Sequence, residues 1–126
     1  MKTPFLPISW GEVFDKHSIL VTKKLRLTDP AKLANVQHEL WEIEKVLQPH
    51  GFAPDLADAY RELLIINGSL WNIEEGKRQC EKEQRFDAHF IQLARQVYML
   101  NDQRAAIKRK INVLLGSDIV EEKSYA

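Results

Sequence analysis

Hydrophobic residues recur every three or four positions along most of this chain, which is the spacing of an amphipathic α-helix. Glycine and proline number only five each, and most prolines lie at the ends of the periodic segments, as in an all-helical protein. The pattern predicts four helices, over residues 10–27, from 30 to a break at 48, from about 55 into the low eighties, and from about 87 to 115. Two prolines and a glycine predict the clearest loop between residues 48 and 55.

The residues at the expected helix ends carry familiar capping signals. Ser9 followed by Glu12 forms a capping box, in which the hydroxyl accepts a backbone hydrogen bond and the carboxylate accepts one in return. Asp29 before Pro30 predicts the start of the next helix, because proline suits the first helical position. Gly116 is placed to end the last helix as a C-terminal cap.

The second and fourth helices indicate how the chain assembles. Apolar residues of the second helix follow at intervals of three and four, the seam of a helix packed in coiled-coil fashion along another: Leu33, Val36, Leu40, Ile43 and Leu47. The fourth helix covers some 28 residues, or roughly 42 Å at about 1.5 Å per residue. A compact chain of this length has a radius of gyration of only about 14 Å. Part of the fourth helix is therefore expected to pack on a second copy.

These features predict an all-α, four-helix up-and-down bundle whose last two helices form a long antiparallel C-terminal helical hairpin, assembled as a homodimer. We expect residues 1–126 to form one domain, with residues 1–8 as an N-terminal arm and residues 117–126 as a C-terminal tail. A chain of this length removes roughly two-thirds of its extended surface from water, so its core needs no disulfide or structural metal.

Charge and cysteine content narrow the range of partners and compartments. The 18 basic residues balance 18 acidic ones, so no overall field draws nucleic acid or an anionic membrane to the chain. Cys80 is the only cysteine, which excludes an intramolecular disulfide and every multi-cysteine zinc or iron–sulfur site. Pro4 and Pro7 stand where a signal peptide needs an apolar run, so a cytoplasmic location is favoured. The longest apolar runs fall far short of about 20 residues, so no membrane span is expected.

The motifs of common enzyme classes are missing from the sequence. The four histidines include no pair three or four positions apart, and no Glu-x-x-His is present, so a metal site is not expected. No glycine-rich phosphate loop and no nucleophile elbow occur either. We therefore expect no cofactor and name no catalytic residue, and the sequence favours a non-enzymatic protein.

Polar and charged side chains interrupt the apolar stripes of the last two helices. They are Asn67, Glu74 and Arg78 on the third helix, and Asn101, Arg104, Lys108 and Asn112 on the fourth. Burying a charge is costly unless an opposite charge pairs with it, so we expect Glu74 to face Arg104. The favoured interpretation is a polar seam that fixes the register of the helices or lies at a dimer interface. The alternative is a small anionic ligand held by Arg78, Arg104 and Lys108.

One basic cluster and two tryptophans are candidate contact surfaces. The cluster consists of Arg104, Lys108, Arg109 and Lys110. It lacks the interleaved aromatic residues that stack on bases, so it is read as a solvated face and nucleic acid is disfavoured as a partner. Trp10 and Trp71 are candidate contact aromatics for an unidentified protein partner, because tryptophan is prominent in interface energetics. Packing at the edge of the core is the other interpretation of both.

Short stretches spread over nearly the whole chain carry a resemblance to known proteins. They are Ile8–Val13 with Asp15–Lys16, Leu70–Glu74, Phe86–Asp87 through Phe90–Ile91, Leu93–Arg95, Val97–Tyr98, Asn101–Asp102, Arg104–Ala105, Ile107–Lys108 and Glu121–Tyr125. On these stretches the chain resembles a bacterial family of small all-helical proteins of unknown function. The family has no known activity, so the resemblance transfers no catalytic residue. Its members are often encoded near glycosyltransferases of surface polysaccharide synthesis, and the resemblance implies a link with cell-envelope polysaccharide assembly.

The sequence favours a non-enzymatic cytoplasmic interaction or accessory module. The alternative is a small helical enzyme or anionic-ligand binder with a charged pocket between helices, similar in architecture to the all-helical chorismate mutases. In place of the characteristic arginine pattern of those enzymes, the first helix has Lys16, Lys23, Lys24 and Arg26. A closed pocket with Arg78, Arg104 and Lys108 converging would favour the enzyme, and a flat, partly apolar exposed face would favour the interaction module.

Overall fold

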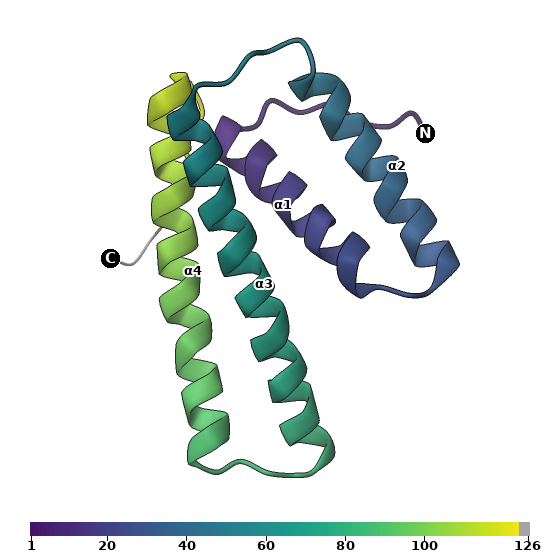
Figure 1. The fold of residues 1–126 in the computed structure, drawn as a ribbon, viewed down its shortest axis with the longest axis vertical. Coiled ribbons are helices and arrows are strands. Elements are labelled where there is room, and N and C mark those ends of the chain that lie inside the picture. The colour runs from purple at the N-terminus through teal and green to yellow at the C-terminus, as the bar shows by residue number, and fades with distance from the viewer. Residues whose placement is uncertain (124–126) are drawn as a thin grey trace.

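In the computed structural model, which describes residues 1–123, the chain forms four α-helices and no strand within that range (Figure 1). They are α1 (Trp10–Arg26), α2 (Pro30–Leu47), α3 (Pro54–Lys82) and α4 (Ala88–Leu115). The prediction of an all-α protein with four helices is confirmed. The end of the predicted C-terminal tail, residues 124–126, and the last part of the resemblance, Ser124–Tyr125, lie outside the described residues.

The predicted helix caps are largely present. Ser9 Oγ accepts a hydrogen bond from the Glu12 backbone N–H at 3.2 Å, and Asp29 Oδ1 accepts one from the first turn of α2. Gly116 ends α4 in the left-handed conformation, with a φ of 63° at which a side chain would be strained. The capping box is only half formed among the described residues, because the Glu12 carboxylate turns to the Lys108 ammonium, 2.7 Å away.

The helices are arranged around α1. α3 and α4 are the two longest helices and lie side by side, with α4 running back along α3 after residues 83–87 (Figure 1). α1 packs along both of them, whereas α2 packs along α1 alone among the described helices, and its last residue, Leu47, reaches the apolar cluster formed by α1, α3 and α4. Within the described chain, α1 therefore has α2 on one side and the α3–α4 pair on the other.

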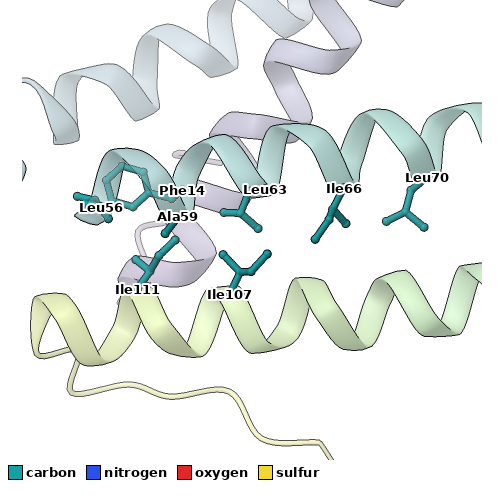
Figure 2. Packing of buried hydrophobic residues seen from close by; sticks show 8 residues of the cluster. All are labelled: Phe14, Leu56, Ala59, Leu63, Ile66, Leu70, Ile107 and Ile111. Carbon is teal, nitrogen blue, oxygen red and sulfur yellow. The ribbon is translucent and has the colours of Figure 1, made fainter. Parts of the chain in front are cut away.

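Two apolar clusters correspond to the two sides of α1. The larger cluster joins α1, α3 and α4 through Phe14, Leu56, Ala59, Leu63, Ile66, Leu70, Ile107 and Ile111 (Figure 2). The smaller one joins α1 and α2 through Leu20, Val36 and Leu40. Phe14 is the buried residue that α1 contributes to the larger cluster. Burying one large apolar side chain of this kind contributes roughly 1.5–3 kcal/mol.

The joined end of the α3–α4 pair extends beyond α1 and α2 (Figure 1). Arg26, the last residue of α1, donates a hydrogen bond to Asn72 Oδ1 at 2.7 Å, which marks how far α1 reaches along α3. Beyond that point α3 and α4 pack closely on each other, since a Cβ at Gly76 would lie 3.1 Å from the Leu93 side chain. This end of the pair is therefore an extension held by its own two helices.

Candidate functional site

A buried network of polar side chains joins α1 to the α3–α4 pair. Its centre is Asp15 on α1, which is only 1% exposed. Asn67 on α3 donates from Nδ2 to Asp15 Oδ1 at 3.1 Å and to Ser18 Oγ at 2.7 Å. Arg104 on α4 places its Nε 3.6 Å from Asp15 Oδ2 and its Nη1 3.5 Å from Asn67 Oδ1. One carboxylate thus holds together side chains from three helices.

Lys108 extends this network toward the start of α1. Its ammonium lies 2.7 Å from Glu12 Oε2, 3.2 Å from Glu121 Oε2 and 3.9 Å from Asp15 Oδ2. Burial by itself lowers the pKa of Lys108, but the hydrogen bond and charge of Glu12, together with Glu121 and Asp15, outweigh it and raise the pKa. Burial by itself raises the pKa of Glu12, but the Lys108 ammonium outweighs it and lowers the pKa. The two groups therefore form an ion pair throughout the neutral range.

The first turn of α1 also bonds directly to the end of α4. The Gly11 N–H donates to Asn112 Oδ1 at 2.7 Å, and the Trp10 N–H donates to Ser117 Oγ at 3.0 Å. Both donors lie in the first turn of a helix, where backbone N–H groups have no partner within the helix. A Cβ at Gly11 would lie 2.4 Å from the Lys108 carbonyl oxygen, so glycine is what allows this approach.

The buried polar groups are mutually satisfied. Every buried side-chain nitrogen and oxygen in the described part of the chain has a hydrogen-bond partner. Burial of a charge is costly, but opposite charges and hydrogen bonds offset that cost, and Asp15 has both. A ligand or substrate could bind Asp15 only after an internal contact is given up. The arrangement is suited to fixing α1 on its neighbours.

Of the seven polar residues predicted on the stripes of the last two helices, Asn67, Arg104 and Lys108 come together around Asp15. Asn112 contacts α1 as well, as the acceptor of the Gly11 N–H. The expected pairing of Glu74 with Arg104 is wrong, because Asp15 of the crossing helix α1 reaches Arg104 instead. The Glu74 side chain is 47% exposed and pairs with a lysine of its own helix at 3.4 Å. Arg78 is exposed on α3, and Asn101 lines a groove on α4.

Sequence reasoning missed Asp15 and the face of α1 to which it belongs. Gly11, Asp15, Ser18 and Thr22 are all buried and follow at intervals of four, three and four, which places them on one face of α1. The sequence analysis recognised the buried sides of α1 that carry large apolar residues. Because α1 has neighbours on two sides, it also buries the face with these small and polar residues. Their regular spacing was the signal in the sequence for that face.

A smaller polar link passes from α1 to α2 and α3 through His17. Its Nδ1 lies 2.5 Å from the Tyr60 hydroxyl on α3, and its Nε2 lies 3.4 Å from Glu44 Oε1 on α2. Burial, together with the negative charge of Glu44, raises the pKa of Tyr60 to about 12. The phenol is therefore neutral at physiological pH and serves as a hydrogen-bond partner of the imidazole.

A groove of about 730 Å³ runs along α4 beside the chain that follows it. Its charged lining includes Arg104, Lys108, Arg109, Glu121 and Glu122. The groove is open at the surface, where the Arg109 and Glu122 side chains are 56% and 70% exposed. Arg78 does not line it, so the convergence of Arg78, Arg104 and Lys108 expected of an enzyme pocket is not found among the described residues.

The predicted contact tryptophans are both partly covered. Trp10 packs against the larger apolar cluster. Trp71 is half-buried, and its indole N–H donates to a carboxylate one turn further along α3 at 2.9 Å. The most exposed tryptophan is Trp41, at 53%, where the Lys45 ammonium lies 4.0 Å from the ring centroid. That cation covers part of the Trp41 ring.

Over residues 1–123, no three histidine, cysteine, aspartate or glutamate side chains gather so that they could hold a metal ion. No helix in that range has an apolar stretch long enough to cross a bilayer. Comparison of the chain with protein-family models, curated proteins and solved structures found no match. The resemblance to a bacterial family stays a prediction, and the functional argument rests on the side chains themselves.

Proposed function

We propose that this chain is a non-enzymatic interaction module that forms a homodimer through the joined end of its α3–α4 pair, which α1 and α2 leave uncovered. The architecture that goes with this proposal is an up-and-down bundle with a long antiparallel C-terminal hairpin, in which two copies cover each other through coiled-coil contacts. The observation that carries the proposal is a set of large apolar side chains exposed on that end.

These side chains are Phe86, Ile91, Tyr98 and Met99, each about half exposed. Ile91 and Tyr98 are seven residues apart in α4, so they share one face of the helix. Single exposed apolar residues are ordinary on a protein surface. Aromatic and aliphatic side chains that share one face are typical of an interaction surface.

A second copy is the partner that the proportions of the chain favour. α4 has 28 residues and α1 has 17. At about 1.5 Å per residue, α4 is longer by roughly 16 Å. Most homo-oligomers are dimers with twofold symmetry, in which one face packs against the same face of the other copy. Ile91 and Tyr98 of each copy would then cover those of the other.

The cellular setting that we propose is the cytoplasm, in an accessory role in cell-envelope polysaccharide synthesis. The cytoplasmic part is supported by the single cysteine, Cys80, which is a buried free thiol. The polysaccharide part is supported by the resemblance alone. Both parts of this proposal are independent of the homodimer. Either of them can be wrong while the homodimer is right.

Light scattering coupled to size-exclusion chromatography tests the homodimer. Tyr98→Glu and Ile91→Glu each place a charge in the proposed interface and should reduce the mass from twice 14.7 kDa to 14.7 kDa. Val113→Glu is the matched control, because it makes the same kind of change at an exposed position near the other end of α4. That variant should remain a dimer. A wild-type chain that is monomeric at high concentration, or face variants that stay dimeric, would refute the proposal.

The alternative function is binding of a small anionic ligand, or enzymatic chemistry on one, between the helices. The groove beside Arg104 and Lys108 is the observation in its favour. Two features weigh against it: Arg78 lies elsewhere, and both cations already face carboxylates. Titration calorimetry with phosphate and with succinate separates the two functions. Saturable binding of either anion, lost in Arg104→Met, would favour the ligand binder.

A further inference from the structure

We infer that the groove on α4 binds an extended acidic peptide of a partner protein, and that residues 121–123 of this chain, which form one side of the groove, pair with its charged residues as an internal competitor. This inference goes beyond the proposed homodimer. The groove involves α4 residues 101–112, whereas the apolar face proposed for the dimer lies at residues 86–99. Either site can exist without the other.

The path of the chain after α4 places the segment along one side of the groove. The left-handed Gly116 turns the chain back at the end of the helix. The following segment then runs beside α4 in the opposite direction, as Figure 2 shows. Later residues of the segment therefore meet earlier positions of the helix: Glu121 lies against Lys108, whereas Lys123 lies against Asp102.

Three ion pairs define the charge pattern of this contact. They join Glu121 to Lys108 at 3.2 Å, Glu122 to Arg109 at 2.9 Å, and Lys123 to Asp102 at 2.9 Å. On the helix, two adjacent cations are followed, nearly two turns closer to its start, by an anion. On the segment, two adjacent anions are followed by a cation, so each charge faces one of opposite sign. A peptide with an acidic-acidic-basic sequence in an extended conformation would match the same positions.

The segment is held loosely enough to be displaced. The Glu122–Arg109 pair is exposed on both sides, at 70% and 56%, and contributes little to stability. Glu121 is 66% exposed and faces the better covered Lys108. No described backbone–backbone hydrogen bond ties residues 118–122 to α4. The Lys108–Glu12 pair beneath the segment is better covered, so Lys108 stays in position when the segment leaves.

The groove also has room for an incoming chain. Its volume of about 730 Å³ remains hollow while the segment is in place. Binding pockets usually measure about 300–1,000 Å³. A partner peptide could therefore enter beside the segment before the segment leaves. The short connection from Gly116 gives the segment a millimolar effective concentration, so it lowers the affinity of any peptide that competes for the same cations.

Solution NMR tests this inference on the full chain. The probe is an acetylated peptide of sequence Asp-Ile-Val-Glu-Glu-Lys, which is that of residues 118–123. The released variant carries Glu121→Gln and Glu122→Gln, which remove the two anions of the internal competitor. The peptide should shift the amide signals of residues 101–112 and bind the released variant about tenfold more tightly than the wild-type chain. Raising the salt from about 20 to about 200 mM should weaken this binding.

Charge reversal tests whether Arg109 binds the second glutamate of the peptide. In the released variant, Arg109→Glu should abolish binding, and a peptide with lysine in place of its second glutamate should restore it. Lys110→Glu, at the neighbouring exposed position outside the groove lining, is the matched control and should leave binding unchanged.

Three outcomes would overturn the inference. They are equal binding to the wild-type and released chains, absence of binding to the released variant, and undiminished binding to the Arg109→Glu variant. An RNA oligonucleotide that binds more tightly than the peptide would likewise overturn the assignment to an acidic peptide. These variants leave residues 86–99 unchanged, so the mass of the chain reports on the homodimer separately. A monomer that binds the peptide refutes the homodimer alone.

Discussion

Replacing Gly11 by alanine tests the place where α1 comes closest to α4. A methyl group built there lies 2.4 Å from the Lys108 carbonyl oxygen and 2.9 Å from Asn112 Oδ1. Carbon and oxygen atoms that are not bonded to each other approach to about 3.3 Å. α1 must therefore move away from α4 by roughly 1 Å at this point. That movement breaks the 2.7 Å hydrogen bond from the Gly11 N–H to Asn112.

The expected loss of stability follows from three terms. Overpacking costs about 1–3 kcal/mol, and a buried N–H without an acceptor costs about 1–3 kcal/mol. Alanine returns about 1 kcal/mol through its higher helix propensity. We therefore expect Gly11→Ala to lower the free energy of unfolding by about 1–5 kcal/mol. In urea denaturation followed by circular dichroism, with a slope of about 2 kcal/mol per molar, the midpoint should fall by roughly 0.5–2.5 M.

Gly68→Ala is the matched control, because Gly68 lies inside α3 and a Cβ there meets no atom within 4 Å. The same chemical change should raise stability by up to about 1 kcal/mol at this position. The two alanine variants should thus differ in the sign of their effect. A Gly11→Ala chain as stable as wild type would refute the close approach of α1 to α4.

Three further predictions concern groups at the helix contacts. Asn112→Ala removes the acceptor of the Gly11 N–H and should cost about 1–3 kcal/mol in the same urea assay, and wild-type stability would contradict that contact. Spectrophotometric titration should show Tyr60 ionising at about pH 12 in the folded chain. Stability should therefore fall between about pH 10 and pH 12, where only the unfolded phenol is ionised, and Tyr60→Phe should remove that part of the fall. Glu12 has a lowered pKa and Lys108 a raised one, so their pair should stabilise the fold fully between about pH 5 and pH 10. Its contribution should be lost in acid as Glu12 is protonated and in alkali as Lys108 is deprotonated, and thermal melts of Glu12→Gln that change with pH as the wild type does would contradict it.

The ends of the helices could be predicted because they are set by local chemistry. Ser9, Asp29 and Gly116 each act on backbone groups within about one turn of themselves. No knowledge of the tertiary structure is needed to read such signals. The crossing of α1 over the α3–α4 pair is different, since it depends on distances between residues far apart in the sequence.

The partner of Arg104 could not be predicted for the same reason. The sequence places both Arg104 and Glu74 on inward stripes, but which carboxylate reaches the guanidinium depends on where α1 lies. That position depends in turn on Gly11, which lets α1 approach α4, and on the buried face that carries Asp15. The kind of network was therefore predictable from the cost of burying charge, and the run of small and polar residues on α1 was a signal for the face that carries Asp15, whereas the pairing of Asp15 with Arg104 was not predictable.

The central claim is that buried charges on α1 and α4 stabilise the fold by pairing with each other. A double-mutant cycle of Asp15→Asn and Arg104→Met, measured by urea denaturation, tests this claim most directly. Because Arg104 is partly exposed and Asp15 keeps Asn67, we expect a coupling energy of about 1–2 kcal/mol, below the full cost of breaking a buried pair. The exposed Asp58–Arg61 pair is the matched control and should couple by less than about 0.5 kcal/mol. The claim would be contradicted if the effect of the double variant on the free energy of unfolding equals the sum of the effects of Asp15→Asn and Arg104→Met to within about 0.5 kcal/mol.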